Sequence, residues 1–108
     1  GQSAIYIYAS SYNVIEGNMI DYASKGTNNS ADSISIHYNG SNYSTYNIIA
    51  NNNIQASQAN KARYHINETA AGCDYNLVIG NICKDGATGQ INLQGANSVR
   101  GTNIPATG

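Results

Sequence analysis

Hydrophobic and polar residues follow a pattern that recurs four times along this chain of 108 residues. It is clearest in YNLVIGNIC, a nearly apolar run that begins with Tyr-Asn and carries a Gly-Asn pair near its end. The copies are YNVIEGNMI at 12–20, YNIIANNNI at 46–54, YNLVIGNIC at 75–83 and ANSVRGTNI at 96–104. A pattern that recurs at intervals of tens of residues indicates similar units stacked on one another. We therefore treat residues 1–108 as a single repetitive segment.

The positions within each copy have separate structural roles when the copies are aligned without gaps. The fourth position is aliphatic in every copy, as Ile15, Ile49, Val78 and Val99. The sixth position is occupied by Gly17, Asn51, Gly80 and Gly101. Glycine and asparagine are the residues that most readily adopt a left-handed backbone. Each copy therefore predicts a strand, a left-handed kink and the start of another strand.

Asparagine recurs at two positions of the pattern. The second position of the copies is Asn13, Asn47, Asn76 and Asn97, and the seventh position is Asn18, Asn52, Asn81 and Thr102. A buried amide needs hydrogen-bond partners, and amides at one bend of successive units can supply them to each other. We predict a structural ladder made by the seventh position of the four copies.

A second pattern lies between these copies and has the period of two that is typical of strands. It comprises AIYIY at 4–8, SISIH at 33–37, RYHIN at 63–67 and QINLQ at 90–94. The expected inward residues are Ile5 and Ile7, Ile34 and Ile36, Tyr64 and Ile66, and Ile91 and Leu93. The connections vary in length, because successive asparagines of the second position are 34, 29 and 21 residues apart. We expect loops to grow on one side while the strands stay aligned.

The composition supports strands and turns. The chain has 17 Asn, 14 Ile and 9 Tyr against one Pro, and strong helix formers are scarce. Hydrophobic residues make up 41% of the chain at regular spacing, which favours a packed core over disorder. A net charge of −1 with 10% charged residues argues against nucleic acid as a partner. No apolar run approaches the roughly 20 residues that span a bilayer, so we expect no membrane insertion.

These residues carry a resemblance to a known fold family. The repeated N-x-I-x-G-N-x-I resembles the right-handed parallel β-helix of the pectin-lyase-like superfamily. YNLVIGNIC followed by TGQINLQGANSVRGTNI is similar to the β-helical region of tail-spike and preneck-appendage proteins of Gram-positive (Bacillus-type) phages. It is also similar to proteins related to glycoside hydrolase family 28. The resemblance implies an all-β solenoid of about four coils, and we expect this chain to be a fragment of a longer β-helix.

Two other folds fit the residues less well. A β-sandwich also has short strands and frequent turns, but it does not require Tyr-Asn and Gly-Asn at fixed offsets in four copies. A leucine-rich horseshoe requires leucine at consensus positions, and those leucines are absent.

The resemblance implies that the chain binds a cell-wall or capsular polysaccharide along the outward faces of its strands. Tyrosine rings stack on sugar faces, and Asn, Gln, His and Ser side chains hydrogen-bond to hydroxyl groups. Two outward columns are predicted, Tyr6, Ser35, His65 and Asn92 in one, and Tyr8, His37, Asn67 and Gln94 in the other. The candidate binding residues are Tyr6, Tyr8, Ser35, His37, Arg63, His65, Asn92 and Gln94. The alternative is that these are ordinary solvated residues or a subunit interface.

Catalysis is left open by the residues. Glycoside hydrolysis generally needs two facing carboxyl groups about 5–10 Å apart. The acids are Glu16, Asp21, Asp32, Glu68, Asp74 and Asp85, and no column of the alignment holds two of them. The last four are expected to be solvated loop acids. A pairing among them is not ruled out by the alignment.

Neither a metal nor a cofactor is expected. Two cysteines without a matching histidine pattern do not indicate a metal site, and His37 and His65 fall in different columns. Cys83 stands where other copies have isoleucine, which predicts a small buried side chain. The sequence is also compatible with a disulfide between Cys73 and Cys83 but does not require one.

Three functions follow as hypotheses. The first is part of a phage tail spike or appendage that binds, and in some members degrades, host surface polysaccharide. The second is a purely structural segment of a trimeric fibre, because spikes of this kind are commonly homotrimers. The third is a secreted bacterial polysaccharide lyase or hydrolase. The corresponding locations are the virion or the extracellular space.

Overall fold

The described residues of the computed structural model, 3–21 and 28–108, form an all-β protein with eleven short strands and no helix. The first six strands are β1 (Ile5–Tyr8), β2 (Val14–Glu16), β3 (Met19–Asp21), β4 (Ile34–His37), β5 (Ile48–Ala50) and β6 (Asn53–Gln55). The other five are β7 (Ile66–Glu68), β8 (Leu77–Ile79), β9 (Ile82–Lys84), β10 (Ile91–Asn92) and β11 (Val99–Arg100). No helix in the described part of the chain could cross a membrane.

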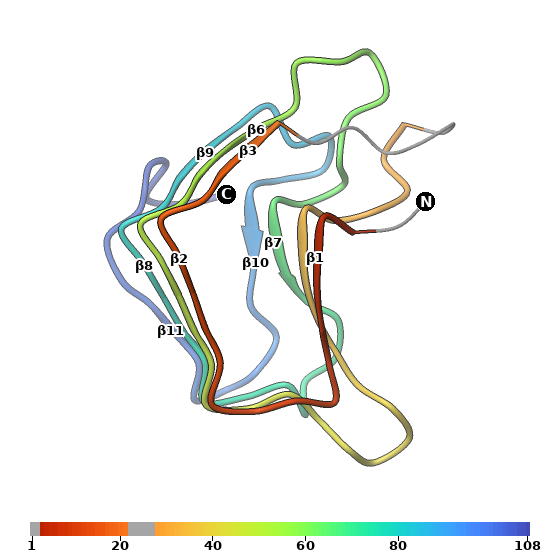
Figure 1. Cartoon of the computed structure of the whole chain (residues 1–108), viewed down its shortest axis with the longest axis vertical. Helices are drawn as coiled ribbons and strands as arrows, with labels where there is room; N and C mark the ends of the chain where they lie inside the picture. The colour runs from red at the N-terminus through yellow and green to blue at the C-terminus, as the bar shows by residue number, and fades with distance from the viewer. Residues whose placement is uncertain (1–2, 22–27) are drawn as a thin grey trace.

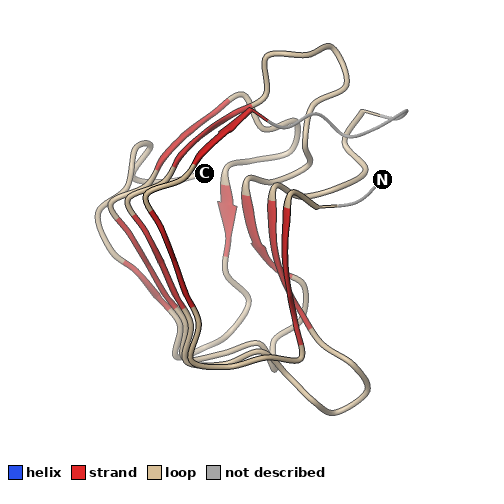
Figure 2. Cartoon of the chain, in the orientation of Figure 1, coloured by secondary structure: helices blue, strands red, loops and turns tan. Residues whose placement is uncertain are grey.

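The strands form three sheets, and every pairing between named strands is parallel (Figures 1 and 2). Sheet A has the order β1-β4-β7-β10, sheet B the order β2-β5-β8-β11 and sheet C the order β3-β6-β9. The chain therefore passes through sheets A, B and C in turn and then begins again beside its previous passage. We call each passage a round. In the fourth round sheet C is continued by a parallel bridge between Ile82 and Ile104.

The inward side chains of the three sheets meet in one aliphatic core. Ile34, Ile36, Ile49, Ile54, Ile66 and Val78 are fully buried, and Ile7, Cys83 and Ile91 are nearly so. β-branched side chains suit this interior because they pack well against the pleated surface of neighbouring strands. The predicted inward position of the first three copies, Ile15, Ile49 and Val78, belongs to this core.

Residues with a left-handed backbone conformation turn the chain between sheets B and C. Gly17, Asn51 and Gly80 have φ of 71°, 56° and 71°, which agrees with the kink that the sequence predicts. At residue 80 the positive φ favours glycine, and a Cβ atom there would require the side chain of Asn51 to shift. Tyr12, Tyr46 and Tyr75 also have positive φ, of 63°, 56° and 57°, at the corner before sheet B.

The fourth copy lies one residue out of the predicted alignment. Val99 pairs with Leu77 and Arg100 with Val78, so the last step is 22 residues and not 21. Val99 is therefore exposed, and Arg100 takes the inward row of Ile15, Ile49 and Val78. Arg100 donates from Nη1 to the carbonyl of Ile91 at 3.3 Å and from Nη2 to that of Pro105 at 3.0 Å. Gly101 has no left-handed φ, and Thr102 stands level with Gly80.

Two asparagine ladders connect the rounds. In the ladder at the bend between sheets B and C, Nδ2 of Asn18, Asn52 and Asn81 donates to Oδ1 of the next member at 3.0, 2.9 and 3.0 Å. The last acceptor is Asn103, so the prediction of Thr102 as the fourth member was wrong. In the ladder before sheet B, Asn13 donates to Asn47 and Asn47 to Asn76. That ladder ends at Ser98, whose Oγ accepts from the backbone of Asn76.

Candidate functional site

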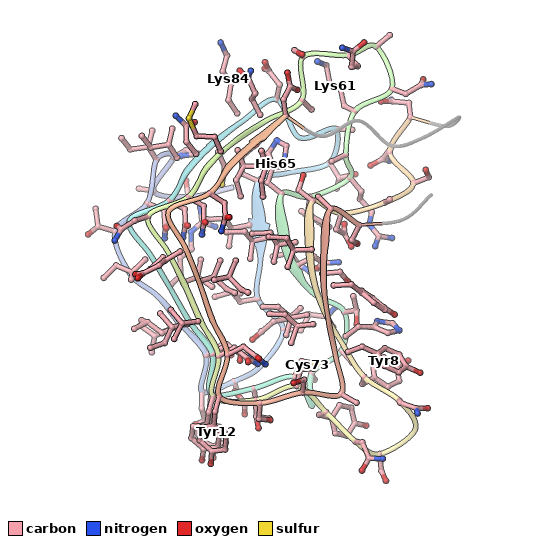
Figure 3. The ribbon with its side chains drawn as sticks, viewed as in Figure 1. Tyr8, Tyr12, Lys61, His65, Cys73 and Lys84 are labelled. Carbon is pink, nitrogen blue, oxygen red and sulfur yellow. The ribbon has the colours of Figure 1, made fainter. Side chains whose placement is uncertain are left out.

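The outer side of sheet A carries a group of mutually contacting aromatic rings, which we call the tyrosine–histidine cluster. Its members are Tyr6, Tyr8, His37, Tyr38 and Tyr43. The centroids of Tyr6 and Tyr8 are 5.4 Å apart, and His37 lies 5.4 Å from the first and 5.9 Å from the second. Tyr38 is 4.9 Å from His37 and 5.6 Å from Tyr43. In Figure 3 Tyr8 points outward from β1.

The alternation along β1 and its register with β4 place the first three rings. Ile5 and Ile7 face the core, so Tyr6 and Tyr8 must face outward. Tyr8 pairs with His37 across the sheet, and Tyr6 pairs with Ser35. Tyr6 and Tyr8 are 53% and 47% exposed, which leaves much of each side chain accessible to a ligand.

Local contacts hold the remaining members of the cluster. His37 shares a 2.6 Å hydrogen bond through Nδ1 with the hydroxyl of Thr69. The loop after β4 is closed by two backbone hydrogen bonds of 2.9 Å between Asn39 and Asn42. The ring of Tyr43 lies so close to Gly72 that a Cβ atom there would overlap it. The cluster is therefore supported by its own loop and by Thr69 and Gly72 of the third round.

Beyond the cluster the outer row of sheet A is polar and mostly occupied by internal hydrogen bonds. This row runs through Tyr6, Ser35, Asn67 and Asn92. Asn92 donates to Asn67 at 2.8 Å, and Asn67 donates to Asp32 at 2.9 Å. Ser35 and Asn67 are each only 4% exposed. Of the candidate binding residues on this row, Tyr6 is the most accessible.

The third strand of sheet A lies two residues away from its predicted alignment, and this changes the position of His65. Ile66 pairs with Ile34 and Asn67 with Ser35, so His65 precedes the strand. His65 is fully buried, and its predicted place on the outer surface was wrong. Its Nδ1 lies 2.8 Å from the hydroxyl of Ser33, and its Nε2 lies 2.7 Å from the carbonyl oxygen of Lys84 (Figure 3). His65 therefore connects sheet A with β9 across the interior.

Burial has the largest effect on the pKa of His65 and lowers it, because a charged imidazole loses hydration in the interior. The hydrogen bond with the carbonyl of Lys84 and the carboxylates of Asp85 and Asp21 oppose this effect, while Lys61 adds to it. Nε2 faces a carbonyl and must donate, so Nδ1 of the neutral ring accepts from Ser33.

Arg63 and Gln94 are engaged in structural contacts. Arg63 makes a two-pronged ion pair with Asp32, at 3.1 Å from Nε to Oδ1 and 2.8 Å from Nη2 to Oδ2. Asp32 also accepts from the backbone of Tyr64 and is 3% exposed. Gln94 donates from its side chain to the carbonyl of Glu68 at 3.0 Å. Neither residue takes part in a ring contact of the cluster.

Two of the expected loop acids are buried in the fold. Asp32 is paired with Arg63, and Glu68 occupies the inward position that pairs with Ile36. The carboxylate of Glu68 accepts from Nδ2 of Asn76 at 2.7 Å, from the backbone of Gly95 at 2.9 Å and from the hydroxyl of Ser98. The expectation of solvated loop acids was wrong for both residues.

The exposed acid Asp21 and the half-buried acid Asp74 support turns. Asp21 accepts from the backbone and hydroxyl of Ser57, and these hydrogen bonds lower its pKa. Asp74 accepts from the backbone and side chain of Asn97 at 2.7 and 2.8 Å. In the part of the chain that the structure describes, no group of three or more His, Cys, Asp or Glu residues could hold a metal ion.

Both cysteines are free thiols inside the protein. Cys83 occupies the aliphatic position that pairs with Ile54, in agreement with the prediction. Burial raises its pKa to about 12 and raises that of Cys73 as well. Neither thiol is suited to act as a nucleophile at neutral pH, because the thiolate is the reactive form.

A second aromatic group, the tyrosine ladder, follows the corner before sheet B. Tyr12, Tyr46 and Tyr75 stack nearly parallel, with centroids 5.5 and 5.1 Å apart and interplanar angles of 6° and 9°. Tyr12 projects away from the corner (Figure 3). The three side chains are 79%, 50% and 49% exposed. Their facing rings are in contact with one another, so the ladder offers mainly ring edges and hydroxyl groups.

A hollow of about 290 Å³ lies beside the cluster at the first round. It is lined by both sides of β1 and by Ser10, Asn13 and Ile15. Ile5, Ile7 and Ile15 are inward residues, so the hollow lies at the end of the aliphatic core.

Sequence reasoning did not include Tyr38 and Tyr43 among the binding residues. Tyr38 follows His37 directly, so strand alternation points it inward, and it packs against the aliphatic core while its ring still contacts His37 and Tyr43. Tyr43 is brought to the cluster by the loop and by Gly72, and no local pattern indicates this contact.

No protein-family model, no curated protein and no solved structure matches this chain.

Proposed function

We propose that the three parallel sheets are the faces of a right-handed parallel β-helix and that the tyrosine–histidine cluster binds a polysaccharide. The observation that carries this proposal is the group of mutually contacting rings on a rigid sheet, with Tyr6 and Tyr8 about half exposed. The resemblance of the repeat to tail-spike and preneck-appendage proteins supports the choice of ligand. On this proposal the chain acts in a virion or outside a cell, where it contacts cell-wall or capsular polysaccharide.

The chemistry of the cluster favours a neutral sugar. Aromatic rings cover the apolar faces of pyranose rings, and tyrosine hydroxyls and imidazole nitrogens hydrogen-bond to sugar hydroxyls. The cluster contains no Lys, Arg, Asp or Glu, and the nearby Arg63 is paired with Asp32. An acidic polysaccharide would find no unpaired cation within the cluster. We therefore expect neutral glycans to bind better than acidic glycans of the same length.

The test is a panel of neutral and acidic cell-wall glycans, with binding measured by titration calorimetry. Tyr6→Ala, Tyr8→Ala and His37→Ala should each weaken binding about fivefold, since a stacked aromatic contact contributes on the order of 1 kcal/mol. Tyr12→Ala is the matched control, because it removes an exposed tyrosine from another corner. Binding that survives the triple substitution of Tyr6, Tyr8 and His37 would place the glycan elsewhere.

A second candidate is a purely structural role in a homotrimeric fibre. It is supported by the two asparagine ladders and the tyrosine ladder, which stiffen the stack along its length. A chain that binds no glycan and is trimeric by light scattering would favour this role. Release of reducing sugar from a cell-wall preparation would instead favour the third hypothesis, a polysaccharide-degrading enzyme.

A further inference from the structure

The outer face of sheet B is aliphatic. One outward row runs through Val14, Ile48, Leu77 and Val99, which pair directly from strand to strand. The next outward row runs through Glu16, Ala50 and Ile79. Val14 is 58%, Val99 55%, Ile79 39% and Ile48 38% exposed. We call the four residues of the first row together with Ile79 the sheet B face; Ala50, between Glu16 and Ile79, is only 6% exposed and adds little to it.

The inner row of the same sheet is also apolar over the first three rounds. Ile15, Ile49 and Val78 belong to the core, so β2, β5 and β8 carry aliphatic side chains on both sides. Strands that are apolar on both sides are typical of sheets covered on both faces. Figure 1 shows β2, β5, β8 and β11 along one edge of the molecule, with no described segment outside them. This side therefore lacks the cover that its composition indicates.

The apolar surface continues on both sides of the sheet B face. The tyrosine ladder borders it at one corner. At the other corner it is bordered by Met19, Ile82 and Ile104 of the sheet C row, which the exposed Asn53 interrupts between Met19 and Ile82. Met19 is 85%, Ile104 63% and Ile82 44% exposed. The outer side of sheet A differs, since its rows contain Tyr, His, Ser and Asn. The apolar surface is thus confined to one side of the molecule.

The charge of this surface indicates the kind of partner. Glu16 is the one charged residue in the outward rows of sheet B among the strand residues described, and no Lys or Arg lies in them. A helix or sheet that binds anionic lipid normally has basic residues beside its apolar surface. A regular apolar sheet instead fits another sheet, because two sheets pack face to face about 10 Å apart with their side chains interdigitated.

We propose that the sheet B face packs against the sheet B face of a second copy of this chain. An identical face offers rows at the same strand spacing of about 4.8 Å, so ridges of one copy can enter grooves of the other. This contact lies apart from the tyrosine–histidine cluster on sheet A and is independent of the glycan proposal. Two identical faces in contact close a two-fold dimer, so this contact is distinct from the homotrimer of the structural hypothesis.

The size of the face predicts a weak contact. Four strands about 4.8 Å apart and three residues of about 3.3 Å give sheet B a flat area of about 200 Å², and the bordering rows raise it to about 400 Å². Apolar patches of a few hundred Å² mark interaction sites, but a standard interface uses about 800 Å² per partner. The chain should therefore be in equilibrium between monomer and assembly over roughly 10 μM to 1 mM.

The experiment is sedimentation equilibrium over that range of concentration. The wild-type chain should show a mass of two or more copies at the upper end, and Ile48→Lys or Leu77→Lys should weaken association at least tenfold. Tyr8→Lys on sheet A is the matched control and should leave association unchanged. A wild-type chain that stays monomeric at about 1 mM, or lysine variants that associate like the wild type, would overturn the proposal.

A cross-linking measurement avoids dependence on a lysine in a sheet. Ile48→Cys introduces an exposed thiol, whereas the natural Cys73 and Cys83 are buried with raised pKa values. Under mild oxidation Ile48→Cys should form covalent dimers, and Tyr8→Cys should form few. Equal cross-linking by the two variants would show random collision and count against the sheet B face.

Discussion

Individual side chains of this protein take positions that their chemistry does not suggest. Glu68 pairs in register with Ile36 and is fully buried, yet its carboxylate receives three hydrogen bonds from two later segments. A buried carboxyl group is tolerated where several donors replace the hydrogen bonds that water made to its oxygens. Glu68 thus connects the third round with the Gly95–Ser98 turn of the fourth.

Protonation of His65 should destabilise the fold. Its pKa is lowered in the folded state, chiefly by burial, so the unfolded chain takes up the proton first as pH falls. The stability that His65 contributes is complete above its unfolded pKa of about 6.5 and is lost as pH falls below that value. The loss ends once pH lies below the folded pKa.

Urea unfolding between pH 8 and 5 measures this effect. The free energy of unfolding should decrease across pH 6.5 in the wild-type chain. His65→Gln keeps a donor toward the carbonyl of Lys84 but does not titrate, so its stability should depend less on pH in this window. An identical pH dependence in both proteins would contradict the role given to His65.

At the scale of the elements, stability depends on side chains that repeat in register. An inner ladder asparagine such as Asn52 satisfies groups in two neighbouring rounds, so its loss leaves unpaired atoms in both. The strands themselves contain two to four residues and would not persist alone. The ladders and the parallel pairings therefore stabilise one another.

Asn52→Ala should lower the free energy of unfolding by about 2–4 kcal/mol. Asn52 accepts from the backbone and side chain of Asn18 and donates to Asn81 and to the carbonyl of Ile15. Asn53→Ala is the matched control, because the adjacent Asn53 is exposed on β6. This substitution should lower the free energy of unfolding much less. Chemical denaturation measures both, and equal losses would mean that the ladder adds little.

Register was the part of the element structure that the sequence predicted least well. The first three copies of the main repeat align as expected, because Asn and Gly mark their bends. The fourth copy contains asparagine at both 97 and 103. The gapless alignment placed Asn97 level with Asn76 and Thr102 level with Asn81, whereas in the structure Asn103 follows Asn81 in the ladder. A shift of one residue exchanges the two faces of a strand, which moved Val99 outward and Arg100 inward. The hydrogen bond to Asn103 decides between the two alignments.

At the scale of the whole molecule, one side of the stack is polar and aromatic and another is aliphatic. This asymmetry separates the proposed glycan site on sheet A from the proposed contact on sheet B. A ligand and a second copy could then bind at the same time without competing for surface. Substitutions on one side should leave the other function intact.

The proposed self-association predicts a melting temperature that depends on protein concentration. Binding that occurs only in the folded state adds about 1.4 kcal/mol when the partner is at ten times its dissociation constant. For a chain of this size that corresponds to a rise of about 5–10 °C. Calorimetry at increasing concentration measures the rise, and Ile48→Lys should remove it. A wild-type melting temperature that is independent of concentration would argue against association.

The sequence by itself determined the strands, the left-handed bends and the inward aliphatic row of the first three rounds. These features depend on local preferences, since β-branched residues favour strands and Gly and Asn tolerate positive φ. The tertiary structure decided which residues lie level with one another, and thereby the burial of His65, Glu68 and Asp32. It also brought Tyr43 to the cluster and left the sheet B face uncovered. Those outcomes depend on contacts between distant segments and on what covers each surface, and a local pattern does not contain that information.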